Sequence, residues 1–294
     1  MRSLPHGPVL AWTTRVAWVL MAALGGGIVD DLVAGRSGWG PTAVTTTAVI
    51  VWAVTAVASA IPSARSLTVI RVLAPTPLLA TLITSATGLT PAVDAAAPAA
   101  LGMAVVAVTV GAGFGRHNIQ SSAYGAEDRF PLRAPPAYLV AAALAWALTM
   151  TGGGLTIMWM RSGDVLGTVL GGIVTAVLAG VSAPRWHRLA RRWLVLVPAG
   201  IVVHDPLVLA ETLMIRRHDV AGVTLADVDT EAADLSGPSG GHLLEIRLRS
   251  MVTTVLNAGP RSPGGRAIHL GAALVAPSRP GATLAAIRRR GHPA

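Results

Sequence analysis

The chain has 294 residues, of which 52% are hydrophobic and only 13% are charged, and its mean hydropathy is +0.60. Soluble globular domains carry about 25% charged residues, so this composition argues against an ordinary soluble protein. The net charge is +9, and all 23 basic residues are arginines. Because the chain has no cysteine, disulfides, thiolate metal sites, cysteine nucleophiles and palmitoylation are excluded.

Six apolar segments are predicted to cross a membrane, since a transmembrane helix needs about 20 mostly apolar residues. The first is the least regular: its charge-free run, Val16–Val29, has 14 residues and reaches full length only if Arg15 extends toward the headgroups. A signal peptide is the alternative for this segment, but no small-x-small cleavage site follows it. The predicted transmembrane domain covers residues 1–182, with spans at about 9–29, 41–60, 67–87, 95–114, 139–160 and 165–182.

Arginine placement predicts the orientation, because positively charged loops stay in the cytoplasm. With the N-terminus inside, the outer side holds only Arg36 and Arg161, whereas ten arginines are cytoplasmic. We therefore expect a multi-pass protein of the cell (inner) membrane with cytoplasmic N- and C-termini. The ten cytoplasmic arginines are Arg2, Arg15, Arg65, Arg116, Arg129, Arg133, Arg185, Arg188, Arg191 and Arg192.

Small residues and prolines predict how the spans are built. The GxxxG patterns at 111–115 and 167–171 allow close approach between neighbouring helices. The connection over residues 161–164 is so short that the last two spans form an antiparallel hairpin. Pro75 and Pro77 predict a kink in the third span, where freed backbone groups could line a cavity.

A basic juxtamembrane linker over residues 183–192 leads to a cytosolic domain over residues 193–294, where short β-type runs alternate with turn signals. In the clearest strand, Leu244, Ile246 and Leu248 alternate with charged residues, as a half-buried strand requires. A terminal amphipathic helix starts at Pro280. We expect a small barrel or sandwich closed by this helix. The predicted strands are 193–197, 201–204, 212–215, 220–225, 244–249, 251–256 and 267–275.

Two stretches of this domain carry a family resemblance. Residues 192–204 have the sequence Arg-Trp-Leu-Val-Leu-Val-Pro-Ala-Gly-Ile-Val-Val-His, and residues 212–223 combine a strand, a turn and the start of the next strand. They resemble the opening hairpin and the following segment of bacterial pleckstrin-homology-like (PH-like) domains attached to membrane helices. The resemblance covers about residues 192–291 and implies a PH-like barrel with one C-terminal helix. The whole chain also resembles polytopic membrane proteins common in actinobacteria, from which no catalytic motif carries over.

The transmembrane domain contains one set of candidate site residues. Asp30 and Asp31 follow a glycine triplet at 25–27, and intramembrane carboxylates often couple to protons or cations. Arg71 lies about one turn inside the third span, where it could bind an anion or pair with an aspartate. The alternatives are that both aspartates lie in the outer interface and that Arg71 extends to the inner headgroups.

Basic residues near and within the cytosolic domain form a second candidate set. A juxtamembrane cluster favours contact with the anionic inner leaflet, and arginines on strands could bind lipid headgroups or an acidic partner. The alternative is a solvated strand face. Nucleic acid is not expected, because aromatic residues for base stacking are scarce in this half. The candidates are Arg188, Arg191, Arg192, Arg216, Arg217, Arg247 and Arg249.

Catalytic and metal-binding patterns are missing from the sequence. The eight histidines are scattered, and the glycine clusters lack the context of a phosphate-binding loop. The 115–137 segment has no metal-ligand spacing, so we interpret it as an ordinary polar cytosolic loop. We expect no cofactor and no metal.

The sequence therefore favours a non-enzymatic membrane protein. Its cytosolic domain would bind or position partners at the membrane, within cell-envelope machinery, and a protein partner and homo-oligomers are both compatible with this view. The alternative is a small transporter or lipid-handling protein that uses Asp30, Asp31 and Arg71.

Overall fold

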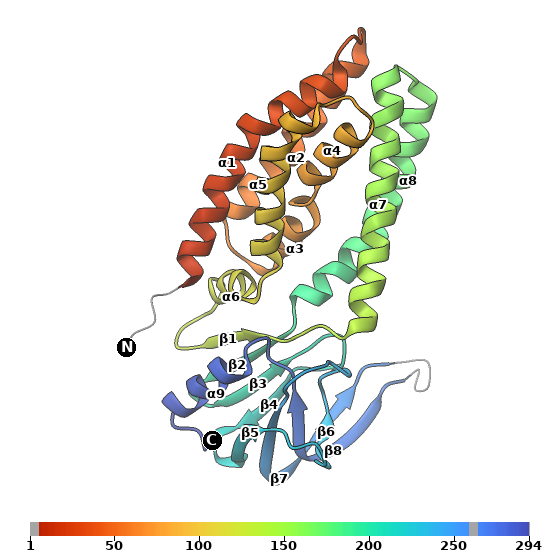
Figure 1. The fold of residues 1–294 in the computed structure, drawn as a ribbon. Helices are drawn as coiled ribbons and strands as arrows, with labels where there is room; N and C mark the ends of the chain where they lie inside the picture. Colours follow the sequence, from red (N-terminus) through yellow and green to blue (C-terminus); the bar gives the residue numbers. More distant parts are fainter. Residues whose placement is uncertain (1–5, 259–263, 294) are drawn as a thin grey trace. The chain divides into compact units, whose positions relative to one another are not determined.

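The computed structural model describes residues 6–258 and 264–293, and the chain divides into two compact units (Figure 1). The helical unit comprises Met1–Asn118 and Ala142–Arg185. The β unit comprises Ile119–Ala141 and Trp186–Ala294, so it combines the C-terminal part of the chain with a segment that lies between two helices.

Six helical spans among the described residues are long and apolar enough to cross a membrane, in agreement with the six predicted spans (Figure 1). These features support a multi-pass membrane protein. The first helix is longer than predicted, since it continues through Asp30 and Asp31. The spans are α1 (His6–Val33), α2 (Trp39–Ala60), α3 (Ala64–Leu73) with α4 (Thr76–Ala86), α5 (Ala92–Val110), α7 (Pro136–Ser162) and α8 (Val165–Ala190).

The third span is interrupted between α3 and α4, as Pro75 and Pro77 predict. Pro77 has no N–H to offer the carbonyl of Leu73, and the Thr76 hydroxyl donates to that oxygen instead, at 2.7 Å. The indole N–H of Trp146 on α7 donates to the neighbouring Val72 carbonyl at 2.9 Å. Side chains therefore satisfy backbone groups at the break, which makes it a packed kink.

The helices α7 and α8 form the predicted hairpin, and glycines allow their close contact. A Cβ atom added at Gly167 or Gly171 would lie 2.6 Å or 2.8 Å from ring atoms of Trp159. The hydroxyls of Thr156 and Thr175 also meet across the pair at 3.4 Å. The 167–171 motif therefore packs a glycine face of α8 against a tryptophan of α7.

The second predicted packing motif, at 111–115, has a different role. Gly111 adopts an extended backbone (φ −61°, ψ 145°) and ends α5, so the motif does not lie within one transmembrane helix. A short helix, α6 (Ala112–Gln120), follows it. Gly115 instead accommodates the guanidinium of Arg71, whose Nη2 would lie 3.0 Å from an added Cβ.

The β unit contains two four-stranded sheets, with strand orders β1-β2-β3-β4 and β5-β7-β8-β6 (Figure 1). All pairs are antiparallel except β6 with β8, which is parallel. The strands are β1 (Asp128–Pro131), β2 (Trp193–Val197), β3 (Gly200–His204), β4 (Leu213–Arg216), β5 (Val220–Leu225), β6 (Ala233–Asp234), β7 (Leu244–Leu256) and β8 (Arg266–Val275), with α9 (Pro280–Arg289) last.

One hydrophobic core joins both sheets and α9. Ile201 from the first sheet, Ile246 from the second and Ile287 from α9 are each 0% exposed within it. Phe130 of β1 lies in the same cluster. The two sheets correspond to the sandwich alternative, and the described strands do not form the closed barrel that the PH-like resemblance implies.

The interpretation of residues 115–137 as an ordinary loop was wrong. Its Asp128–Pro131 stretch forms β1, which pairs with β2 in register from Asp128↔Leu196 to Pro131↔Trp193. Burial of Phe130 and Leu132, two residues apart on one face, drives this pairing.

Two boundaries also differ from prediction. The expected separate strands at 244–249 and 251–256 are one strand, β7, with an irregularity in its pairing with β8 between Arg247 and Val252. The juxtamembrane stretch is not an extended linker, because α8 continues through Pro184 to Ala190. Trp186 and Ala190, four residues apart on one face of this last turn, are both buried, which stabilises the helix.

Candidate functional site

The two aspartates of the first candidate set lie far from its third member, Arg71. Asp30 is exposed, and Asp31 accepts a hydrogen bond from the Thr90 hydroxyl, 2.8 Å, just before α5 begins. Arg71 donates through Nε to the carbonyl of Thr109, 3.1 Å, at the other end of α5. A 19-residue helix is about 28 Å long, so the structure does not bring the aspartates and Arg71 into one site.

Arg71 instead stabilises the end of a neighbouring helix. Besides Thr109, its guanidinium donates to the carbonyl of Val110, the last residue of α5, at 3.4 Å. Arg15 on α1 does the same at the end of α2, with donors 2.9 Å from the Ser59 oxygen and 3.4 Å from the Ala60 oxygen. A cation at the C-terminal end of a helix complements the helix dipole and unpaired carbonyls there.

Arg192 was predicted on an exposed basic face, and the structure contradicts this placement. Its side chain and that of Asp205 are both 0% exposed and form a bidentate pair, with Nε to Oδ1 at 2.8 Å and Nη2 to Oδ2 at 2.6 Å. The guanidinium also donates to the carbonyls of Arg133 and Ser236. Hydrogen bonds to the buried carboxylate and to the two carbonyls stabilise this arginine in the interior of the β unit.

The other basic candidates are exposed, but they do not form one face. Arg188 lies on the last turn of α8, and Arg191 follows it. Arg216 lies on β4. Arg247 is partly neutralised, because its Nε donates to Glu245 Oε1 at 2.9 Å. Two members of the predicted set, Arg217 and Arg249, line a common hollow.

This basic hollow has a volume of about 620 Å³ and is lined by Arg217, His218, Val220, Arg249, Gly291 and Pro293. Arg217 Nη2 donates to the Gly291 carbonyl, 2.9 Å, and Arg249 Nε donates to the Val220 carbonyl, 3.3 Å. Within the described residues, neither guanidinium makes an ion pair. Each arginine is therefore held by a main-chain oxygen and retains N–H groups and a full charge for an anion.

Local backbone features explain why these residues meet. Residues 217–219 form a single 3-10 turn between β4 and β5, which places Arg217 and His218 beside the start of β5. The helix α9 ends at Arg289, and Gly291, two residues later, has a φ of +69°, a left-handed conformation that favours glycine. The Pro293 carbonyl then accepts the Val223 N–H at 2.9 Å, so the end of the chain pairs with β5 and forms one wall of the basic hollow.

His292 lies between these wall residues and is 5% exposed. Burial, together with the nearby Arg217 and Arg290, lowers the pKa of this histidine below its ordinary value of 6.5. The ring is therefore neutral at pH 7, and the positive charge of the hollow comes from the arginines.

One acidic group lies close to the basic hollow. Asp219 accepts a hydrogen bond from the Ser250 hydroxyl at 3.1 Å, and its Oδ1 is 3.6 Å from His218 Nε2. This carboxylate is thus hydrogen-bonded beside the hollow, and Asp219 is not among the residues that line the hollow. The net charge at the hollow is therefore positive.

The basic hollow offers hydrogen-bond donors and positive charge to an anion. Across the described ranges, no group of three or more His, Asp or Glu side chains is placed to hold a metal ion. The lining of the basic hollow contains no serine, threonine or carboxylate to act as nucleophile or general base. Its chemistry is that of two arginine donors and a histidine facing solvent.

Comparisons with known proteins give no relative for this chain. No protein-family model, no curated protein and no solved structure matches it.

Sequence reasoning found Arg217 and Arg249 but missed the wall formed by Gly291 and Pro293. A glycine directly after a helix indicates a left-handed helix end, and this signal was visible at Gly291. The pairing of Pro293 with Val223 is a contact between residues 70 positions apart, and no local pattern encodes it.

Proposed function

We propose that this chain is a non-enzymatic multi-pass protein of the cell membrane whose cytosolic domain, of the PH-like type, binds an acidic protein partner and positions it at the inner leaflet. The observation that carries the proposal is the convergence of Arg217 and Arg249 on one open hollow of a well-packed domain, where neither makes an ion pair with any residue that the structure describes. An acidic side chain of the partner would accept from their free N–H groups.

Three further features support this proposal. The chain offers six apolar spans to anchor the domain, and α8 ends only two residues before β2 begins. Arg188 and Arg191 are exposed at this junction, where basic side chains favour anionic lipids. The order of strands in two sheets followed by a terminal helix is compatible with a PH-like domain. A role within cell-envelope machinery is the cellular context we propose.

The transporter alternative is less well supported, since Asp31 and Arg71 contact residues at opposite ends of α5. A transport site built from these three residues would need them near one cavity.

The test places a photo-crosslinking amino acid at His218, an exposed lining residue, in the full chain in native cells. We expect a discrete protein adduct. The adduct should decrease at least about fivefold in Arg217→Ala/Arg249→Ala, because two charge-assisted contacts are lost. Arg266→Ala/Arg279→Ala is the matched control, since it removes the same charge from exposed positions outside the hollow. Absence of any adduct, or equal adducts in all three proteins, would contradict the proposal.

A further inference from the structure

The strand β8 has an edge that other strands of its sheet cover only in part. On one side it pairs with β7 along most of its length. On the other side, β6 contributes only two pairs, Ala233↔Ala273 and Asp234↔Leu274. In the portion of the chain that the structure describes, no strand pairs with this second side of β8 before Ala273.

The direction of the main-chain groups along this edge follows from one hydrogen bond. The Leu235 N–H donates to the Leu274 carbonyl at 3.0 Å, so the main-chain groups of Leu274 face the β6 side. Successive residues of a strand alternate in direction, and those of Ala272 and Leu270 therefore face the same side. Because β6 is parallel to β8 and begins opposite Ala273, the Leu270 groups and the Ala272 N–H lie before the start of β6 and are directed toward an open edge.

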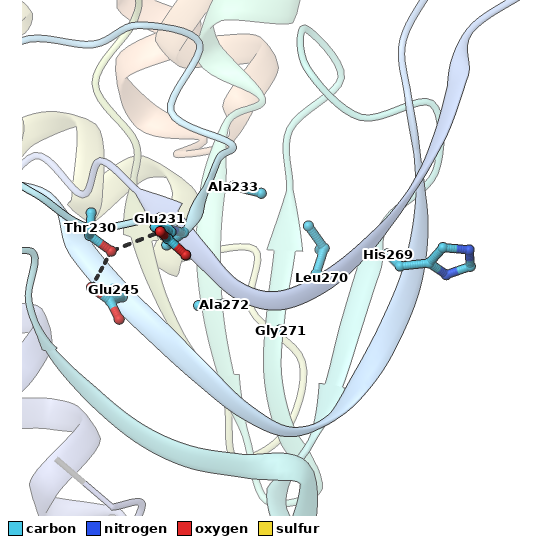
Figure 2. A pocket seen from close by; sticks show the side chains of 9 residues that line it. Thr230, Glu231, Ala233, Glu245, His269, Leu270, Gly271 and Ala272 are labelled. Atoms are coloured by element: carbon cyan, nitrogen blue, oxygen red, sulfur yellow. Dashed lines mark hydrogen bonds between the residues drawn. The ribbon is translucent and has the colours of Figure 1, made fainter.

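A hollow of about 330 Å³ lies directly beside these groups (Figure 2). One side of it is formed by Thr230–Ala233, where the chain leading into β6 has diverged from β8, and the other by His269–Ala272. A Cβ added at Gly271 would meet no atom within 4 Å, so the face of the strand is open at this position. The hollow is thus a gap in the sheet at the place where a further strand would lie.

The rim of this hollow is acidic. The Glu245 carboxylate at its base is already bonded, since it accepts from the Thr230 hydroxyl at 2.8 Å (Figure 2). It also accepts from Arg247 Nε at 2.9 Å. Glu231 is exposed and, among the described residues, makes no ion pair. The 227–234 segment that contains it has four acidic residues and no basic one. The uncompensated charge at the open edge is therefore negative.

From these observations, we propose that the β8 edge binds an extended peptide segment of a partner protein, which adds as a strand in line with β6 and places an arginine or lysine beside Glu231. Main-chain hydrogen bonds to Leu270 and to the Ala272 N–H hold the peptide, and the acidic rim selects a basic side chain. This site goes beyond the proposed function, because it lies at the opposite edge of the β5-β7-β8-β6 sheet from the basic hollow.

The test uses the full chain in lipid nanodiscs and two synthetic probes: the acetylated, amidated peptide Thr-Val-Thr-Arg-Thr-Val-Thr and the same peptide with Glu in place of Arg. Binding is measured by fluorescence anisotropy, and hydrogen exchange follows the Leu270 and Ala272 amides. We expect the arginine peptide to bind more tightly than the glutamate peptide and to protect both amides.

Two variants identify the two parts of the site. Glu231→Arg should lower the affinity for the arginine peptide about five- to tenfold and raise the affinity for the glutamate peptide, because the charge at the rim is reversed. Ala272→Pro removes an N–H that is directed toward the open edge, at a position where proline is tolerated. It should lower the affinity for both peptides. Glu211→Arg is the matched control, since Glu211 is an exposed acid of the same unit outside the hollow, and it should leave binding unchanged.

The proposal is overturned if neither peptide binds, if both bind equally, or if Glu231→Arg has no more effect than Glu211→Arg. If Ala272→Pro unfolds the β unit, the comparison of Glu231→Arg with Glu211→Arg still tests the proposal, because both of these residues are exposed. Failure of this test leaves the crosslinking result at His218 unaffected, because the two sites use different residues.

Discussion

Arg192 and Asp205 form an ion pair in the interior of the β unit, and both side chains are completely shielded from solvent. A buried ion pair adds little to the stability of the folded state compared with two apolar side chains of similar volume. Removal of one partner, however, leaves an uncompensated buried charge. The arginine also satisfies two carbonyls, those of Arg133 and Ser236, which belong to segments far apart in the chain. One guanidinium thus holds together three parts of the β unit.

We expect Arg192→Leu to destabilise the β unit by about 3–5 kcal/mol, because Asp205 would remain buried without its partner. Arg191→Leu is the matched control: Arg191 is exposed, and its loss should change stability by less than about 0.5 kcal/mol. Chemical denaturation of the purified full chain, followed by fluorescence, measures both. Equal stability of the two variants would show that the buried pair is not important for folding.

At the scale of elements, β1 is the most informative feature, since it belongs to a sheet whose other strands lie more than 60 residues further along the chain. Phe130 contributes a fully buried ring to the core, and Arg290 at the end of α9 donates to Asp128 Oδ2 at 2.9 Å. Both contacts fasten the 119–141 segment to the C-terminal part of the chain. A C-terminal fragment without residues 119–141 would lack them.

We therefore expect residues 184–294 alone to fold poorly, and the same fragment fused through a flexible linker to residues 119–135 to fold. In the fused form, Phe130→Ala should destabilise by about 3–5 kcal/mol, because a core aromatic ring is removed. Far-UV circular dichroism and thermal melting measure these differences. Full stability of residues 184–294 without β1 would contradict this account.

The elements that could be predicted are those with a local signal. The apolar runs predicted six spans, and β-type runs bounded by turn signals predicted β2 and β5 with the bounds that the structure shows. In β7, Leu244 and Ile246 are buried as predicted, but Glu245 is also buried because the 230–232 segment covers it. No spacing along the strand could show this, since the covering residues come from another part of the chain.

The candidate site could be predicted from the sequence only in part. Residue type and strand position identified Arg217 and Arg249 as exposed cations, whereas Arg192 has the same chemistry and lies in the core. The difference depends on Asp205 and two carbonyls that tertiary folding brings to Arg192. Sequence could likewise not show that Asp31 and Arg71 contact opposite ends of α5.

For the whole molecule, the decisive property is the side of the membrane on which each connection lies. Ten arginines on one side against two on the other predict that the α7–α8 turn is outside and that the β unit is cytoplasmic. Both proposed binding sites belong to the β unit, so they can meet cytoplasmic partners only in this orientation.

Because the chain contains no cysteine, single introduced cysteines report this orientation without background. Ser37→Cys and Ser162→Cys lie at exposed positions of the α1–α2 and α7–α8 connections, and Ala285→Cys lies on an exposed position of α9. In right-side-out membrane vesicles, a membrane-impermeant maleimide should label the first two and spare Ala285→Cys, and inside-out vesicles should give the reverse. An even number of spans places both termini on one side of the membrane. If Ala285→Cys and Ser162→Cys were both labelled from the outside, α8 would not cross the membrane. The basic hollow and the β8 edge would then lie outside the cell.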